Sequence, residues 1–252
     1  MPGATGESSK YYNQRFSLFS RFAHPPGILL DKESWYSVTP ERIAVHIAQK
    51  AYSCISNTRF PACTCGGVDL ECPCRAGLAV LDAFSGAGGN TIQFALHAPP
   101  GSSVTAIDTL ASRHKIARHN ASVYEIPGPT GAAPISYITA SVLDYLHADC
   151  CPRFDVVFMS PPWGGPGYSS TPDSCWNPET DMPGGLVGSH LLHLARRALA
   201  PGGGVVVLYM PRNVDLDVMK RYGTDSVGCK RVQLESVVLD GRQKALLAWY
   251  FF

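Results

Sequence analysis

The chain has 252 residues, 45% of them hydrophobic and 16% charged, a composition typical of a globular protein with one sizeable core. A net charge of +1 argues against an extended basic surface for a nucleic-acid backbone, although a compact anionic ligand remains compatible with it. The sequence contains neither a signal-like apolar start nor the ~18 consecutive apolar residues of a membrane span. We therefore expect a reducing compartment, the nucleus or the cytoplasm, where the nine cysteines are thiols or metal ligands.

Residues 1–60 predict a helical extension ahead of the core. Helices are expected at Ser9–Phe22 and Thr39–Cys54, the second opened by Thr39 as cap and by Pro40 at the first helical position. A cysteine-rich insertion follows at residues 61–77. Its four closely spaced thiols predict either a structural, tetrahedral zinc site or an unmetallated surface loop; they belong to Cys63, Cys65, Cys72 and Cys74.

Residues 78–252 predict the core domain, because short apolar runs alternate with helical stretches as in a sheet covered on both faces. Five parallel strands are expected, at Leu78–Phe84, Val104–Asp108, Ile135–Thr139, Asp155–Met159 and Gly204–Tyr209. Val232–Val238 and Lys244–Phe251 predict an antiparallel pair joined through Asp240-Gly241. Loops are expected at Pro127–Pro134 and Gly164–Gly188. The fold class is α/β, a Rossmann-like sheet of seven strands.

A turn of small residues follows the first strand. Asp82 ends that strand, Gly86 lies in the turn, and Asn90 and Thr91 open the next helix, so backbone can approach a ligand closely. Thr91 stands where a dinucleotide motif has its third glycine and no phosphate-loop lysine follows, which disfavours NAD and ATP. Asp108 ends the second strand, where an acid can accept both ribose hydroxyls. Together the two acids fit S-adenosylmethionine as cofactor; the alternative is that both only cap the following helices.

The string Ser160-Pro161-Pro162-Trp163 ends the fourth strand. This string is similar to the one that methyltransferases acting on planar amines share, and on that similarity we interpret Ser160, Pro161 and Trp163 as catalytic. A planar amine must have its N–H groups accepted by fixed oxygens and its ring stacked. Attack on a sulfonium needs no strong base, so the proton can leave to solvent. The large π face of Trp163 favours a cationic purine such as 7-methylguanine. The alternative is a structured surface loop with a buried tryptophan.

The sequence resembles the trimethylguanosine synthases, which methylate N2 of the 7-methylguanosine cap of small nuclear and nucleolar RNAs. Nearly the whole chain is covered by the resemblance, and these strings carry it: Lys10–Tyr12, Arg15–Phe22, Trp35–Glu41, Asp82–Phe84, Gly88–Leu96, Ser160–Pro166 and Pro211–Asn213.

The resemblance implies a class I S-adenosylmethionine-dependent methyltransferase that acts as a monomer on 7-methylguanosine-capped RNA. It would produce 2,7-dimethylguanosine, and whether a second methyl group gives 2,2,7-trimethylguanosine is left open. Cofactor contacts are implied for Thr39, Asp82, Gly86, Asn90, Thr91, Asp108, Ser141 and Ser160. Substrate contacts are implied for Lys10, Phe19, Ser37, Trp163, Arg212 and Asn213, with Lys10, Arg212 and Asn213 at the cap phosphates.

The chain departs from the family pattern in three places. Ser141 stands where relatives have an acid for the adenine amine, with Asp144 one helical turn later. Gly167 replaces an acid after Gly164-Gly165-Pro166, and the loop from Ser169 to Gly185 differs most. The cysteine-rich insertion is the third departure.

Three other functions stay open. The first is an N2-guanine or N6-adenine methyltransferase acting on internal RNA positions, which would share the Pro-Pro-aromatic string. The second is a cap-binding module without turnover, and the third is a zinc-dependent RNA adaptor built on the cysteine insertion.

Overall fold

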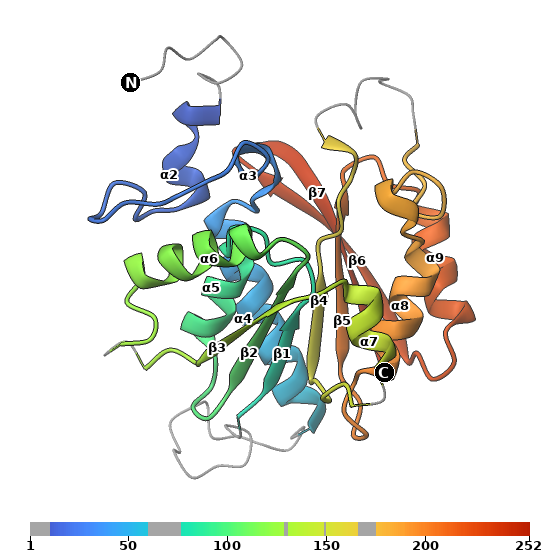
Figure 1. Ribbon diagram of the computed structural model, residues 1–252. Helices are drawn as coiled ribbons and strands as arrows, with labels where there is room; N and C mark the ends of the chain where they lie inside the picture. Colours follow the sequence, from blue (N-terminus) through green and yellow to red (C-terminus); the bar gives the residue numbers. More distant parts are fainter. Residues whose placement is uncertain (1–10, 60–76, 129–130, 149, 166–174) are drawn as a thin grey trace.

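A computed structural model describes residues 11–59, 77–128, 131–148, 150–165 and 175–252 (Figure 1). Its centre is one seven-stranded sheet with the order β3-β2-β1-β4-β5-β7-β6. The pairs among β1 to β5 are parallel, and β7 runs antiparallel to both β5 and β6. The predicted α/β class and the terminal antiparallel pair are therefore confirmed.

All seven strands fall where the apolar runs predict them. Their bounds are β1 Ala79–Asp82, β2 Ser103–Asp108, β3 Ile135–Thr139, β4 Val156–Met159, β5 Val205–Pro211, β6 Arg231–Leu239 and β7 Arg242–Phe251. Every residue of β4 and β5 is buried, which explains why these strands read as continuous apolar runs. Asp240 and Gly241 both have positive φ, 52° and 71°, the backbone that a two-residue hairpin turn with matching twist requires.

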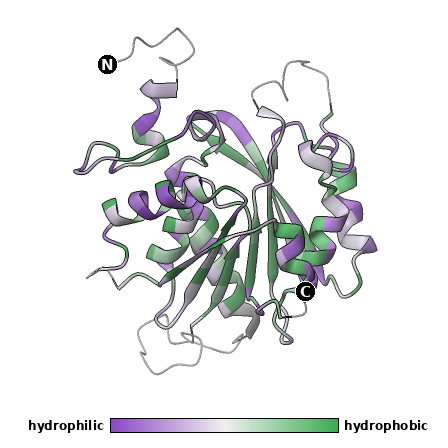
Figure 2. Ribbon diagram, viewed as in Figure 1, coloured by the Kyte–Doolittle hydropathy of each residue, from purple (hydrophilic) through white to green (hydrophobic). Residues whose placement is uncertain are grey.

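Helices cover both faces of the sheet, and Figure 2 shows the strands between them as the most apolar part of the molecule. One core cluster joins alternate strand residues such as Val80 and Phe158 to helices α4 and α5; the other joins Leu81 and Met159 to α7, α8 and α9. The side chains of adjacent strand residues thus point to opposite faces of the sheet. The helices are α4 Glu41–Arg59, α5 Gly89–His97, α6 Ala111–Val123, α7 Val142–His147, α8 Gly188–Arg197 and α9 Leu216–Asp225.

The N-terminal segment differs from the single helix predicted at Ser9–Phe22. Gln14 has φ −93° and ψ 2°, outside the helical region, and α2 spans only Arg15–Leu18 because Phe19 is extended. A further short helix, α3, spans Ser34–Ser37 and was not predicted. These pieces lie beyond the carboxyl ends of the parallel strands (Figure 1).

Helix α4 starts two residues later than predicted and ends five residues beyond the predicted Cys54. The carbonyl of Pro40 accepts from the N–H groups of Ile43 and Ala44, so Pro40 occupies the cap position assigned to Thr39. The Thr39 hydroxyl is thereby left for a contact outside the helix. Tyr52, farther along α4, donates to the carbonyl of Phe94 at 2.6 Å and fixes α4 against α5.

The predicted loop Gly164–Gly188 is partly described, and it contains the 3-10 turn η3 at Pro183–Gly185. None of the helices within the described ranges combines the length and apolar character that a membrane crossing requires. The described residues contain no disulfide bond between any two of their cysteines, which are Cys54, Cys150, Cys151, Cys175 and Cys229. The four cysteines of the insertion, like Lys10, lie outside the described residues.

Candidate active site

The predicted functional residues gather at one edge of the sheet, where the parallel strands end. Asp82 ends β1, Asp108 ends β2, and Ser160 follows β4 directly. Strands β1 and β4 are neighbours, although β2 and β3 lie on one side of β1 and β5 lies beyond β4. The strand order therefore reverses between β1 and β4. Open α/β sheets bind ligands in the crevice at such a switch point.

Asp82, at the carboxyl end of β1 beside this switch point, is 1% exposed. The hydroxyl of Thr91, in the first turn of α5, donates to its Oδ2 at 2.6 Å. Its Oδ1 is buried without a hydrogen-bond partner among the described residues. Burial raises the pKa of Asp82 to about 6, with a smaller contribution from nearby Asp108, while the bond from Thr91 acts in the opposite direction. A buried acceptor oxygen with no donor is a site for a ligand N–H or O–H group.

The turn between β1 and α5 requires glycine at two positions. Gly86 and Gly88 have φ of 50° and 90°, and a side chain at Gly86 would meet no atom within 4 Å. Open space above Gly86 permits close approach of a ligand to the backbone. A Cβ at Gly88 would instead lie 3.2 Å from that of Ala117, so this glycine lets α6 pack against the turn.

Asn90 connects the start of α5 to the N-terminal extension. Its Nδ2 donates to Oγ1 of Thr39 at 2.8 Å, and both side chains are buried. The Oδ1 of Asn90 and the nearby hydroxyl of Ser85 have no hydrogen-bond partner within the described ranges. Three orphaned polar groups on one turn, those of Asp82, Ser85 and Asn90, fit a polar nucleoside cofactor.

The Asp108 carboxylate already accepts two backbone N–H groups. Gly86 donates to Oδ2 at 3.1 Å and Leu110 donates to Oδ1 at 2.9 Å. The second bond closes a turn ahead of α6 and does not cap that helix, because α6 begins at Ala111 and its N-cap residue is Leu110. Because a carboxylate has about four lone-pair positions, these two bonds leave acceptor capacity for ribose hydroxyls.

Trp163 is held in a fixed position after β4. Its Nε1 donates to the carbonyl of Tyr209 at 3.2 Å, and the two ring centroids are 5.3 Å apart. The indole is only partly buried and packs against both core clusters. Gly164 and Gly165 follow with φ of 93° and 75°, and a Cβ at Gly165 would lie 4.0 Å from Cε2 of Tyr36. The N-terminal extension therefore borders the tryptophan loop.

The other predicted contacts surround this edge with different exposures. Phe19 is 1% exposed and lies behind the start of α5, so it supports the site from within the core. Ser37, at the end of α3, is exposed, as is Arg212 beyond β5. The carbonyl of Asn213 accepts from the N–H of Trp176 at 2.9 Å, which joins the described end of the loop from Ser169 to Gly185 to the segment that follows β5. Ser141 precedes α7 without a side-chain cap bond.

Asn120 was not predicted from the sequence, yet it joins the extension to the cofactor turn. Its amide accepts from the N–H of Leu29 at 2.8 Å and donates at 2.9 Å to the carbonyls of Leu29 and Ala87. The side chain is completely buried. An asparagine on the same helical face as buried Ala117 and Ala121 was the available signal.

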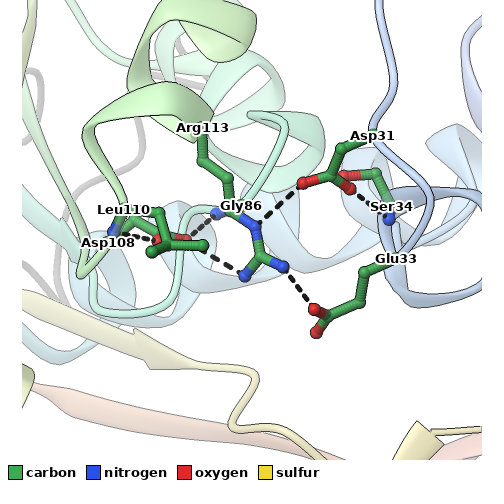
Figure 3. Close-up of polar contacts among 7 residues, drawn as sticks. All are labelled: Asp31, Glu33, Ser34, Gly86, Asp108, Leu110 and Arg113. Atoms are coloured by element: carbon green, nitrogen blue, oxygen red, sulfur yellow. Dashed lines mark hydrogen bonds and ion pairs between the residues drawn. The ribbon is translucent and has the colours of Figure 1, made fainter.

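Glu41 was also not predicted from the sequence. Its carboxylate accepts from the backbone N–H of Ser20 at 2.5 Å, from the Ser20 hydroxyl at 2.8 Å and from the Tyr124 hydroxyl at 2.6 Å. It thereby holds the segment beside Phe19. Arg113 is the third unpredicted residue of the site and reaches Asp108 from α6 (Figure 3).

The sheet order, the two strand-end acids and the orphaned polar groups of the turn define a class I S-adenosylmethionine-dependent methyltransferase. A solved S-adenosylmethionine-dependent O-methyltransferase from Thermotoga maritima shares this fold. It has a TM-score of 0.52, 11% sequence identity, and coverage of 85% of this chain and 66% of that one.

Residues 78–251 match the family of RNA cap guanine-N2 methyltransferases, and the chain belongs to that family. It is 32% identical over 243 residues to the trimethylguanosine synthase of Schizosaccharomyces pombe, covering 96% of this chain and 84% of the relative. Identity to the trimethylguanosine synthase of Saccharomyces cerevisiae is 29% over 223 residues, covering 87% of this chain and 59% of that one. The family expected from the sequence motifs is confirmed, and with it an S-adenosylmethionine-dependent enzyme whose substrate is an RNA cap.

Proposed function

We propose that this chain transfers methyl groups from S-adenosylmethionine to the exocyclic N2 of 7-methylguanosine at an RNA cap. The product would be 2,7-dimethylguanosine and, after a second transfer, 2,2,7-trimethylguanosine. The observation that carries the proposal is Trp163, anchored through its N–H to the carbonyl of Tyr209 directly beside Ser160 and Pro161. A fixed, partly exposed indole is the best side chain for stacking on a cationic purine.

Asp82, Ser85 and Asn90 would hold the polar end of the cofactor through their orphaned atoms, and Asp108 would accept its ribose hydroxyls. Thr39, Thr91 and Gly86 would shape the same pocket, with Ser141 at the adenine. The cofactor supplies an electrophilic methyl group on a sulfonium whose sulfur is a good leaving group.

The residues of this chain would orient the acceptor amine. The Ser160 side chain and the Pro161 carbonyl would accept its two N–H groups, which directs the nitrogen at the methyl group. Trp163 would stack on the base, with Ser37 nearby and Phe19 packed behind. Lys10, Arg212 and Asn213 would bind the cap phosphates, where a few donors suffice for a triphosphate.

Finer assignments belong to the same proposal. Residues 1–60 would act as an extension that completes the cap and cofactor sites of the core domain, residues 78–252, and residues 61–77 as an insertion without a role in the chemistry. The RNAs would be of the small nuclear or nucleolar type, methylated by a monomer in the nucleus or cytoplasm.

The decisive experiment offers the purified chain free 7-methylguanosine triphosphate without RNA and identifies products by mass spectrometry. We expect a gain of one or two methyl groups, and unmethylated GTP should be a much poorer acceptor. Methylation of RNA at internal guanines or adenines, with none on the free cap nucleotide, would favour the internal-RNA alternative. Cofactor binding without any transfer would favour a binding module.

A further inference from the structure

Arg113 lies between the cofactor edge and the N-terminal extension. It belongs to the first turn of α6, and its side chain is 17% exposed. Its Nε is 3.2 Å from Oδ2 of Asp31 and its Nη2 is 2.5 Å from Oε2 of Glu33. Its Nη1 is 3.7 Å from Oδ2 of Asp108 (Figure 3). One guanidinium thus spans two acids of the extension and the acid that ends β2.

Both ends of this bridge continue into the site. Asp31 accepts from the N–H of Ser34 at 2.7 Å through Oδ1, which fixes the start of α3, the helix that ends at Ser37. Asp108 accepts from Gly86 in the cofactor turn. Displacing Asp108 therefore moves a partner of Arg113, and displacing Arg113 moves the acid that holds α3.

The charged forms of Arg113 and Asp31 stabilise each other. Burial opposes the charge of Arg113, but the charge of Asp108 and the bonds to Asp31 and Glu33 outweigh it and raise the pKa of Arg113. Burial alone would raise the pKa of Asp31, yet its bonds from Ser34 and Arg113 lower it below the ordinary value. A planar fork of five donors can satisfy three acids at once, which a lysine ammonium cannot do with the same geometry.

We propose that Arg113 is a positioning residue that couples binding of the two substrates. Cofactor bound at Asp108 orders the segment Asp31–Ser37 for the RNA cap, and a bound RNA cap in turn strengthens cofactor binding. This inference rests on the proposed function, because it takes Asp108 as a cofactor contact and Ser37 as a neighbour of the cap base. Reciprocity is required: each ligand must improve the affinity of the other by the same factor.

The test measures the Kd of 7-methylguanosine triphosphate by calorimetry with and without saturating S-adenosylhomocysteine. For the unmodified chain we expect a tightening of about fivefold or more, the usual lower bound of such coupling. Arg113→Met should reduce this coupling factor, the ratio of the Kd without S-adenosylhomocysteine to the Kd with it, to about one. Arg113→Lys should retain only part of the coupling factor. The matched control is Arg118→Met on the same helix, since Arg118 is exposed and stacks on Tyr137 with its Cζ 4.3 Å from the ring centroid. It should retain the full factor.

A second variant separates coupling from folding. Asp31→Asn with Glu33→Gln leaves Arg113 beside Asp108, so it should keep the affinity for S-adenosylhomocysteine within about twofold and still lose the coupling. An unchanged factor in either variant, or equal losses in the Arg113 and Arg118 variants, would overturn the inference. If the unmodified chain methylates the cap nucleotide but its Kd for that nucleotide is the same with and without S-adenosylhomocysteine, the inference is overturned and the proposed function stands. Absence of methylation would overturn the function itself.

Discussion

The amide of Asn90 donates a hydrogen bond to the hydroxyl of Thr39 across an interface between α5 and the N-terminal extension, with Nδ2 and Oγ1 2.8 Å apart. Thr39 precedes the α4 helix, and Asn90 lies in the first turn after the cofactor loop. The contact joins the extension to the start of α5, and it orients the Asn90 carbonyl oxygen that the proposed function assigns to the cofactor.

Thr39→Val should test this contact, because valine keeps the shape and removes the acceptor. A buried Nδ2 without a partner should cost about 1–3 kcal/mol of unfolding free energy, and the affinity for S-adenosylhomocysteine should fall as Asn90 loses its orientation. Combining it with Asn90→Ala should cost less than the sum of the single changes, as expected for directly bonded residues. Chemical denaturation and calorimetry measure both effects; strict additivity would contradict the bond.

Asp108→Asn should weaken binding of S-adenosylhomocysteine by about 10- to 100-fold, the value of hydrogen bonds to a charged acceptor. Asparagine retains one oxygen for the Leu110 N–H, so the helix start should persist. Asp217→Asn is a suitable control because that side chain is 80% exposed on α9. Unchanged affinity would remove Asp108 from the cofactor site and leave only its contacts with Gly86, Leu110 and Arg113.

Cofactor affinity should depend on pH through Asp82. The proposed function assigns its carboxylate to the polar end of the cofactor, which carries an ammonium group, and burial raises the pKa of Asp82 to about 6 before binding. Below that pH the group is protonated and must lose the proton to bind, so affinity should fall about fivefold from pH 6 to pH 5, approach a tenfold loss per pH unit below pH 5, and change by less than about 1.5-fold from pH 6.5 to 7.5. The Asp82→Asn variant should bind the cofactor weakly, and its affinity should not change with pH in this range. A flat profile for the unmodified chain would contradict the ionised role.

Trp163→Ala should weaken binding of 7-methylguanosine triphosphate by roughly 10-fold or more, given stacking of ~1–3 kcal/mol per base and an added cation–π contribution. Trp163→Phe keeps a smaller π face and should lose less. Comparison with GTP isolates the positive charge of the base, because the preference for the methylated nucleotide should shrink in both variants. Fluorescence titration provides the measurement, and an undiminished preference in Trp163→Ala would assign cap recognition to other residues.

Asn120→Ala should be among the most destabilising single changes near the site. It leaves the buried carbonyl of Ala87 and the part-buried N–H and carbonyl of Leu29 without the amide that pairs with them, at about 1–3 kcal/mol for a buried group and less for a part-buried one. We expect a loss of about 3 kcal/mol or more in urea denaturation. Lys115→Ala, at an exposed position of the same helix, should change stability by less than ~0.5 kcal/mol. Equal stability of the two variants would refute the bridging role.

The sequence alone determined where the seven strands lie along the chain, the glycine-containing turn after β1 and the loop that carries Trp163. These features are local: the apolar strands, the small residues after Asp82 and the rigid string Ser160–Trp163 each dictate their own backbone whatever packs around them. The hairpin at Asp240-Gly241 was predictable for the same reason.

Only the tertiary structure decided how the N-terminal extension joins the site. Gln14 and Phe19 leave the helical region although the surrounding residues favour a helix, because the segment bonds to Glu41 and Tyr124 instead of continuing its own ladder. The pairings of Asn90 with Thr39, of Asn120 with Leu29 and of Arg113 with Asp31 each join residues at least 51 positions apart. No periodicity encodes such a contact, since its partners meet only after the sheet has brought α5 and α6 beneath the extension.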